Sequence, residues 1–314
     1  MLIRNCLAAL MLAILGSGCG QVEMFREQDK IDVKINGKFV TSYLFKSDLT
    51  KPVLYPLNTL SGVTVSRQFP LQIVEGESKD HPHHFGLFFT YDRVNGVGFW
   101  NNTAIPPQIK LVEIKKVENG KTGTISSVHH WVAPNGKILL QEDRSMQFIP
   151  SRKHYAIDFS IQLTAKDTAV VFEDTKEGMF SIRVADWLAE KSGHAEYLSS
   201  NGDRKEKEVW GKRAVWVRLE GAKNGQPLGI AMIHHPNSVN YPTFWHARGY
   251  GLFAANPLGQ ETFERDHNVE NPKAFRLTLA KGESAWFKFR VVVYDGAMDK
   301  AAVDAIAADY AKTN

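Results

Sequence analysis

Asn-Gly pairs placed between alternating apolar segments are the feature that most constrains the fold of this chain. Such pairs occur at Asn36-Gly37, Asn119-Gly120 and Asn135-Gly136, and they join Ile31–Ile35 to Lys38–Val40, Ile114 to Ile125, and Trp131 to Leu140. Asn and Gly tolerate the positive φ angles that two-residue hairpin turns require. Tyr155–Leu163 alternates apolar and polar residues, which is typical of a half-buried strand. We therefore expect antiparallel hairpins along most of the chain.

The C-terminal part of the chain fits the same architecture. Phe275–Leu279 and Ala285–Tyr294 are separated by Lys281-Gly282-Glu283, which predicts a final hairpin, and Lys300–Ala311 carries apolar residues at helical spacing. Strands at regular spacing favour a sandwich or barrel over a βαβ arrangement. We predict an all-β, antiparallel β-sandwich of the supersandwich type with a short C-terminal helix, as a single large domain over residues 21–314. The charged segment Ser192–Lys212 is expected to be a solvated loop.

The first twenty residues read as an export signal. Arg4 supplies a positive start, Leu7–Leu15 is too short to span a membrane as a mature anchor, and small residues precede Cys19. These features predict an exported protein of the periplasm or outer membrane. A lipid on Cys19 is one outcome, and it is the only membrane contact that we expect; ordinary cleavage nearby is the other.

Composition excludes several classes of function. Both cysteines, Cys6 and Cys19, lie in the signal, so the mature body has no disulfide and no thiolate metal site. The formal charge of +4 is small and unclustered, which argues against a nucleic-acid partner. Phosphate-cradling glycine loops, a Rossmann fingerprint and a Gly-x-Ser-x-Gly elbow are all missing from the sequence. A hydrophobic content of 43% suffices for a sizeable core.

A cluster of histidines at Asp80-His81-Pro82-His83-His84 is the first candidate site. Imidazole titrates near neutrality and can donate a proton, accept one or bind a metal. We predict that His83 and His84 act as general acid or base. No cofactor is expected; if a metal ion is present, His81, His83 and His84 are its predicted ligands, although their spacing matches no standard zinc motif.

The second candidate segment is Trp245-His246-Ala247-Arg248-Gly249-Tyr250. In an extended chain His246, Arg248 and Tyr250 point to one face. Arginine can hold a carboxylate with a planar fork, and tyrosine can act as acid or base. We predict His246 and Tyr250 to be catalytic, Arg248 to bind substrate, and Trp245 to be a stacking platform. We also expect this segment and the histidine cluster to line one cleft.

Other residues complete the predicted site. Glu177 is a candidate base, with Arg183 as a binder of an anionic group; an ion pair between the two is the structural alternative. His235, at the end of an apolar strand, and Asn95, within a turn signal, are further candidates for binding substrate. Glu142 is the carboxylate available to act with Glu177 in hydrolysis.

Several segments together resemble the uncharacterised "methane oxygenase PmoA-like" family. They are Asp80–Gly86, Val94–Trp100, Lys176–Ala185, Trp210–Val217, His235-Pro236, Pro242–Gly259 and Phe275–Tyr294. Phe85 departs from the pattern, since many relatives carry Arg there. The family name refers to a membrane-spanning subunit, yet no apolar stretch of about twenty residues follows residue 20. The resemblance therefore implies a secreted, strand-rich domain like the galactose mutarotase-like sandwiches.

These observations predict a carbohydrate-active enzyme. The favoured reaction is cleavage of glycosides or oligosaccharides by hydrolysis or elimination, with histidine as acid or base. Two alternatives stay open, a glycan-binding lipoprotein without catalytic activity and a metal enzyme with histidine ligands. Buried titratable groups in one pocket would favour catalysis, whereas a shallow row of tryptophans would favour binding.

Overall fold

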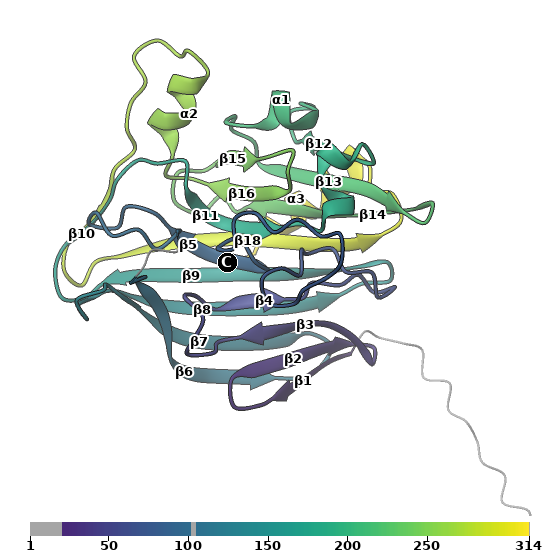
Figure 1. The fold of residues 1–314 in the computed structure, drawn as a ribbon, viewed down its shortest axis with the longest axis horizontal. Coiled ribbons are helices and arrows are strands. Elements are labelled where there is room, and N and C mark those ends of the chain that lie inside the picture. The colour runs from purple at the N-terminus through teal and green to yellow at the C-terminus, as the bar shows by residue number, and fades with distance from the viewer. Residues whose placement is uncertain (1–20, 102–104, 314) are drawn as a thin grey trace, which may run out of the picture.

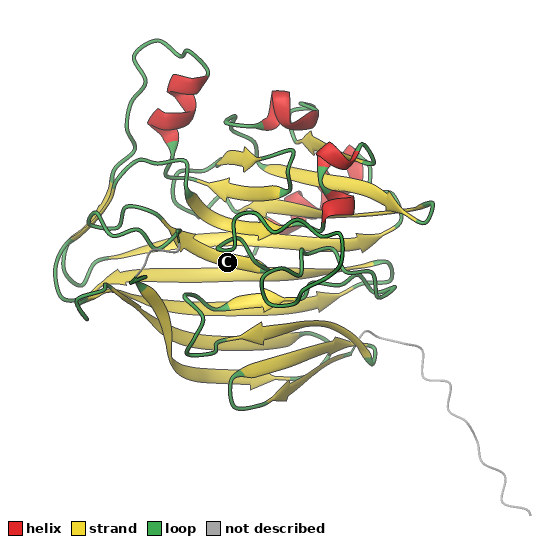
Figure 2. Ribbon diagram, in the orientation of Figure 1, coloured by secondary structure: helices red, strands yellow, loops and turns green. Residues whose placement is uncertain are grey.

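Residues 21–101 and 105–313 are described by a computed structural model of the chain. Strands are the main regular structure, and short helices lie at its periphery (Figure 2). The predicted signal, with Cys19, lies outside the described residues. Within the described ranges, no helix is long and apolar enough to cross a membrane.

Two eight-stranded antiparallel sheets form the body of the molecule (Figure 1). The first sheet contains, in order, β1 (Val22–Arg26), β2 (Lys30–Ile35), β3 (Lys38–Leu44), β4 (Val53–Tyr55), β5 (Leu87–Tyr91), β11 (Gly178–Arg183), β16 (Leu252–Asn256) and β15 (Phe244–Ala247). The second contains β12 (Ala195–Ser199), β13 (Trp216–Lys223), β14 (Gln226–His234), β18 (Ser284–Asp295), β9 (His154–Ala165), β8 (Ile138–Pro150), β7 (Gly123–Val132) and β6 (Gln108–Glu118). A separate pair consists of β10 (Val170–Phe172) and β17 (Leu277–Leu279).

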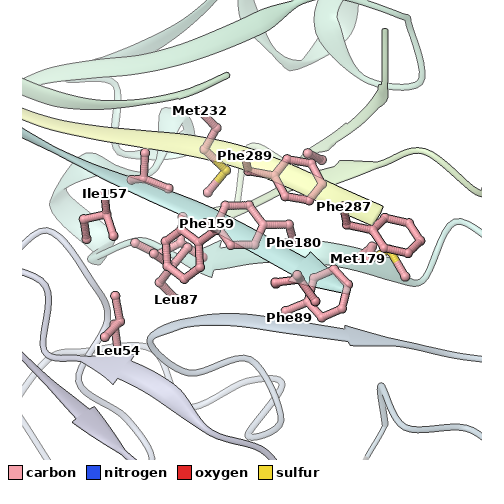
Figure 3. Close-up of a cluster of buried hydrophobic side chains, with 14 of the residues drawn as sticks. Leu54, Leu87, Phe89, Ile157, Phe159, Met179, Phe180, Met232, Phe287 and Phe289 are labelled. Atoms are coloured by element: carbon pink, nitrogen blue, oxygen red, sulfur yellow. The ribbon is translucent and has the colours of Figure 1, made fainter. Parts of the chain in front are cut away.

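The main core lies between the two sheets. Alternate residues of β9 are buried, as the sequence predicts. Phe180 of β11 stacks on Phe289 of β18 with ring centroids 4.6 Å apart, and Phe159 of β9 meets Phe180 edge-on at 4.8 Å (Figure 3). These contacts join the inner faces of the sheets and contribute beyond simple burial of area. The predicted antiparallel β-sandwich is therefore confirmed.

The three Asn-Gly turns connect paired strands as predicted, namely β2 to β3, β6 to β7, and β7 to β8. The predicted final hairpin is wrong. β17 pairs with β10, whereas β18 lies between β14 and β9 in the second sheet. The glycine turn was read correctly, but the partner of a three-residue strand is set by distant segments.

Helices occur in more places than the sequence indicates. The predicted C-terminal helix is α3 (Lys300–Tyr310), capped by Asp299, which accepts a hydrogen bond from the Ala302 amide at 2.8 Å. Two helices were not predicted, α1 (Lys205–Val209) and α2 (Gln260–Asp266). Short 3₁₀ turns lie at Asp186–Leu188 and Glu190–Ser192. The expected solvated loop Ser192–Lys212 in fact contains β12 and α1.

The outer face of the first sheet carries a second, smaller apolar cluster. It includes Tyr55, Phe85, Phe88, Trp100 and Leu252, all buried. The side chains of β5 and β16 that point away from the main core are therefore buried as well. The histidine cluster and the β15–β16 connection meet on this outer face.

Candidate functional site

The histidine loop, residues 80–84, leads directly into β5. The His84 amide donates to the His81 carbonyl at 2.9 Å, which closes a tight turn. His81 has φ +43°, a region that costs residues other than glycine roughly 1–3 kcal/mol. Gly86 follows with φ +62°, and a Cβ there would lie 2.6 Å from the Leu54 carbonyl oxygen. The loop is thus held in a conformation that few sequences adopt.

Two buried arginines hold this loop in place. The Arg67 guanidinium donates to the carbonyl oxygens of Asp80, His81 and His84 at 2.7, 2.9 and 2.8 Å. Arg67 and Arg183 each donate to the Asp80 carboxylate at 2.6 Å. Burial opposes ionisation of Asp80, but the charges of Arg183 and Arg67 together with the contact from His81 outweigh burial and lower the pKa of that carboxyl. Asp80 is therefore the anion on which both arginines converge.

Three parallel rings join the histidine loop to the β15–β16 connection. The His81 ring stacks on His84 at 5.1 Å with an interplanar angle of 2° and on Tyr250 at 5.1 Å with an angle of 5°. His83 meets His84 edge-on at 4.2 Å. The two segments singled out in the sequence are therefore in direct contact, although more than 160 positions separate them.

β15 supplies His246 to the same outer face. In the sheet register His246 lies opposite Ala254, which lies opposite Ser181, so the three share one face. His246 is 3% exposed. Its Nδ1, like Ser181 Oγ and both ring nitrogens of His84, is buried without a hydrogen-bond partner among the described residues. Because buried polar atoms are normally paired, this concentration marks a functional region.

These groups surround one cavity of about 350 Å³, which we name the histidine cavity. It is lined by His81, His83, His84, Asn101, Lys176, Glu177, His246, Arg248 and Tyr250. The structure thus brings both sequence segments and Glu177 to one place, as we expected. Their individual roles stay predictions.

The environment separates the titration ranges of the lining groups. Burial, aided by the charge of Lys51, lowers the pKa of His83 to about 4. Burial, aided by Arg248, lowers the pKa of His246 to about 3, and burial also lowers the pKa of His84. In contrast, burial raises the pKa of Tyr250 to about 12. At neutral pH the cavity therefore offers unprotonated imidazoles beside a protonated phenol.

Among the described residues that line the cavity, two cations accompany a single carboxylate. Lys176 and Arg248 line it together with one carboxylate, Glu177, which lies 3.4 Å from the Lys176 ammonium group. Arg248 Nε lies 3.0 Å from Glu206 of α1, at the rim. The Arg183 guanidinium lies 4.7 Å from the Tyr250 ring centroid, just behind the lining. A group of negative charge is the ligand that this distribution favours.

Four of the predicted binding residues do not line the cavity. Arg183 is fully buried, and its ion-pair partner is Asp80 rather than Glu177. Trp245 faces the inner core, with its Nε1 donating to the Ala214 carbonyl at 3.0 Å, so the prediction of a platform is wrong.

The two other residues lie elsewhere in the fold. His235 follows β14 of the second sheet, and its Nε2 lies 3.1 Å from the carbonyl oxygens of Tyr310 and Thr313. Asn95 sits in a turn, where its side chain bonds the main chain of Ala169 and Val171. Both therefore have structural partners.

The predicted alternatives for metal binding and hydrolysis also lack support from the geometry. The rings of His81, His83 and His84 pack against one another, and no group of three or more His, Cys, Asp or Glu among the described residues is arranged to hold a metal ion. Glu142 is fully buried between the sheets, where it accepts hydrogen bonds from Trp131 and Arg144. It does not meet Glu177.

Sequence reasoning missed several residues that build the site. Lys176 and Asp80 stand next to predicted residues, so their positions carried a usable signal. Arg67 and Lys51 are isolated in the sequence and precede the loop that they hold by 13 or more positions. Only the fold shows that they lie behind the histidines.

Fold and site together define a β-sandwich protein with a polar, histidine-lined cavity on the outer face of one sheet. The chain belongs to the family described as "Family of unknown function (DUF6807)", whose model matches residues 30–308. No curated protein matches the sequence. The resemblance to the PmoA-like family stays a prediction.

Solved structures with a similar arrangement come from carbohydrate enzymes and a related protein. A GH36 alpha-galactosidase from Geobacillus stearothermophilus in complex with raffinose has a TM-score of 0.41 and 11% identity, over 88% of this chain and 41% of that one. A putative aldose 1-epimerase from Klebsiella pneumoniae has a TM-score of 0.41 and 11% identity, over 93% of this chain and 88% of that one. A galactose mutarotase-like protein from Lactobacillus casei has a TM-score of 0.36 and 8% identity, over 87% of this chain and 100% of that one. This chain spans less than half the length of the galactosidase.

Proposed function

We propose that this chain is a carbohydrate-active enzyme that cleaves an acidic oligosaccharide by elimination in the histidine cavity. One observation carries the proposal: unprotonated histidines, a protonated tyrosine and unbalanced positive charge line a single cavity. When the surroundings move the pKa values of two neighbouring titratable groups in opposite directions, one group is suited to act as the base and the other as the acid. Each lining residue carries a polar or charged group, which suits a ligand rich in hydroxyl groups.

The proposed step uses each group for a defined task. Arg248 and Lys176 bind the carboxylate of a uronic acid and stabilise the negative charge that develops next to it. His83 or His246 takes the proton from the sugar carbon that bears the carboxylate. The electron pair of that bond forms a carbon–carbon double bond, and the bond to the glycosidic oxygen breaks. Tyr250 gives its proton to the leaving oxygen.

Elimination fits the cavity better than hydrolysis does. Hydrolysis of a glycoside normally uses two carboxyl groups on either side of the bond. Glu177 is the single carboxylate among the described lining residues, and Glu142 is enclosed in the core. Elimination needs a base, a cation and an acid, and the cavity holds all three.

A surface that only binds glycans is less well supported. Stacking of sugars requires accessible aromatic faces, but Trp100, Trp131, Trp216 and Trp245 are each at most 1% exposed. Trp286 is 44% exposed, but it lies on β18 of the second sheet and does not line the cavity. Buried titratable groups in a concave site favour catalysis. Export to the periplasm or outer membrane stays part of the proposal, because an acidic polymer would be met there.

The first test is turnover of uronate-containing oligosaccharides, measured by the ultraviolet absorbance of the unsaturated product and, for every substrate, by the release of reducing ends. Neutral gluco-oligosaccharides and methyl-esterified uronates serve as comparison substrates. We expect activity on a free uronate and at least tenfold less binding of its methyl ester, because the ester removes the charge that Arg248 would hold. Equal turnover of neutral sugars, or no turnover of any uronate, would contradict the proposal.

Matched variants then test the roles. His83→Gln, His246→Gln and Tyr250→Phe each remove a proton-transfer group, and the true base and acid should each lose roughly 10²-fold or more in kcat. His194→Gln and Tyr241→Phe alter exposed residues outside the cavity and should leave kcat unchanged. Full activity in all three site variants would refute acid–base catalysis here.

A further inference from the structure

Lys51 is a buried cation directly behind the histidine loop. It precedes β4 and is 1% exposed. Its Nζ donates to the His83 carbonyl at 2.9 Å and lies 4.7 Å from the ring centroids of both Phe85 and Phe88. One main-chain oxygen and two aromatic faces thus enclose the ammonium group.

No carboxylate within the described ranges approaches this ammonium group to ion-pair distance; the only influence on its titration is its burial. An unpaired charge in such a place is costly, even with cation–π contacts, which contribute about 0.5–2 kcal/mol each. An apolar side chain of similar length would fill the same space without that cost. The contact that an apolar residue could not make is the hydrogen bond to His83.

We infer that Lys51 is a positioning residue of the histidine cavity: its hydrogen bond to the His83 carbonyl fixes the His83 main chain and, through it, the place of the His83 ring. The inference rests on the proposed function only in giving that imidazole a use as base. Lys51 does not line the cavity and is not a catalytic residue.

The surroundings of His83 support this role. The charged and titratable groups around His83 include Lys51, His81, His84, Arg67 and Arg183. Among them Lys51 has the largest effect, second only to burial, in lowering the pKa of His83 to about 4. The two arginines bind the carbonyls and carboxylate of the loop, whereas Lys51 alone bonds the His83 carbonyl.

The test replaces Lys51 with methionine in the full chain and follows selectively labelled histidine rings by NMR during a pH titration. Lys51→Met should raise the pKa of His83 by about one unit, since it removes a nearby like charge. It should also move the amide signals of His83 and His84. Lys46→Met is the matched control, because Lys46 is exposed on the same connection and pairs only with Asp29 at 3.8 Å.

A second measurement needs no variant. In the unmodified chain the His83 ring signal should show a small additional inflection near pH 7, where Lys51 loses its proton. An unchanged pKa of His83 in Lys51→Met would overturn the inference. If that variant does not fold, the lack of the second inflection in the unmodified chain would overturn it instead.

These readouts use no substrate, so they are independent of the proposed reaction. If the chain turns over no acidic sugar but the pKa of His83 still responds to Lys51, the proposed function fails and the positioning role stands. If turnover is found, Lys51→Met should lower kcat at least tenfold and shift the acidic limb of its pH profile upward by about one unit. A kcat and an acidic limb that both match the unmodified chain would count against the inference.

Discussion

Replacing Lys51 by methionine should make the protein more stable in mildly acidic solution, and the gain should vanish as the pH rises. Burial lowers the pKa of Lys51 from 10.5 to about 7. Between these two values the unfolded chain binds the proton and the folded chain does not, so the stability contributed by this group rises with pH across that window. Below about pH 7 both states are protonated, and the full cost of the buried charge is present.

The magnitude follows from the difference between the two pKa values. One pKa unit corresponds to about 1.4 kcal/mol, so burial of the ammonium group costs about 5 kcal/mol at pH 6 and about 2 kcal/mol at pH 9. Methionine removes that cost but leaves the His83 carbonyl unpaired, which costs about 1–3 kcal/mol. The net gain should then be about 2–4 kcal/mol at pH 6 and close to zero at pH 9.

Urea unfolding followed by tryptophan fluorescence at pH 6, 7.5 and 9 measures this difference directly. Lys46→Met should match the unmodified chain at each pH, because Lys46 is exposed. If Lys51→Met is less stable at pH 6, or if its stability depends on pH as that of the unmodified chain does, Lys51 is not a charge buried at a cost. Its part in the site would then need another explanation.

Three further outcomes are expected. Arg248→Lys should weaken binding of a uronate at least tenfold in a calorimetric titration, because an ammonium group cannot form the planar fork. Asp80→Asn should destabilise the fold by roughly 3–5 kcal/mol in urea unfolding, because it leaves Arg67 and Arg183 without their carboxylate. An unchanged unfolding midpoint would show that the contacts of Asp80 with the two arginines are not important for stability. Turnover should be lost as the pH falls through about 4, where the His83 imidazole becomes protonated, and retained at neutral pH; a loss centred near 6.5 would assign the reaction to a different, exposed group.

The sequence predicted the architecture well because its signals were local. The turn at Asn36-Gly37 and the alternation of β9 report only on neighbouring residues, and both were read correctly. The pairing of β17 with β10 depends on segments more than 100 residues apart, and no local pattern predicts it. The same limitation hid α2, a short helix whose N-cap residue Gly259 has no side chain and whose first-turn amides of Glu261 and Thr262 donate instead to Asp174, a distant residue in the sequence.

The site was predicted in part for a related reason. His246 reaches the cavity, whereas Trp245 enters the core, because neighbouring strand residues face opposite sides. Arg248 and Tyr250 reach the cavity from the turn that follows β15. The alternation shows that two faces exist but not which of them meets the other sheet. His235 failed because it lies at the end of a strand of the second sheet, which sequence order could not indicate.

The ring stack of His84, His81 and Tyr250 has a consequence for how the chain reaches its working form. Its members come from segments on either side of β11, so the stack can close only after β5, β11 and β16 have paired. Contacts between residues far apart in sequence form slowly, since the entropy of closing a long loop must be overcome first. The cavity should therefore form late in folding. Folding intermediates in which Tyr250 has not yet packed on His81 should have much of the sheet structure but no complete cavity.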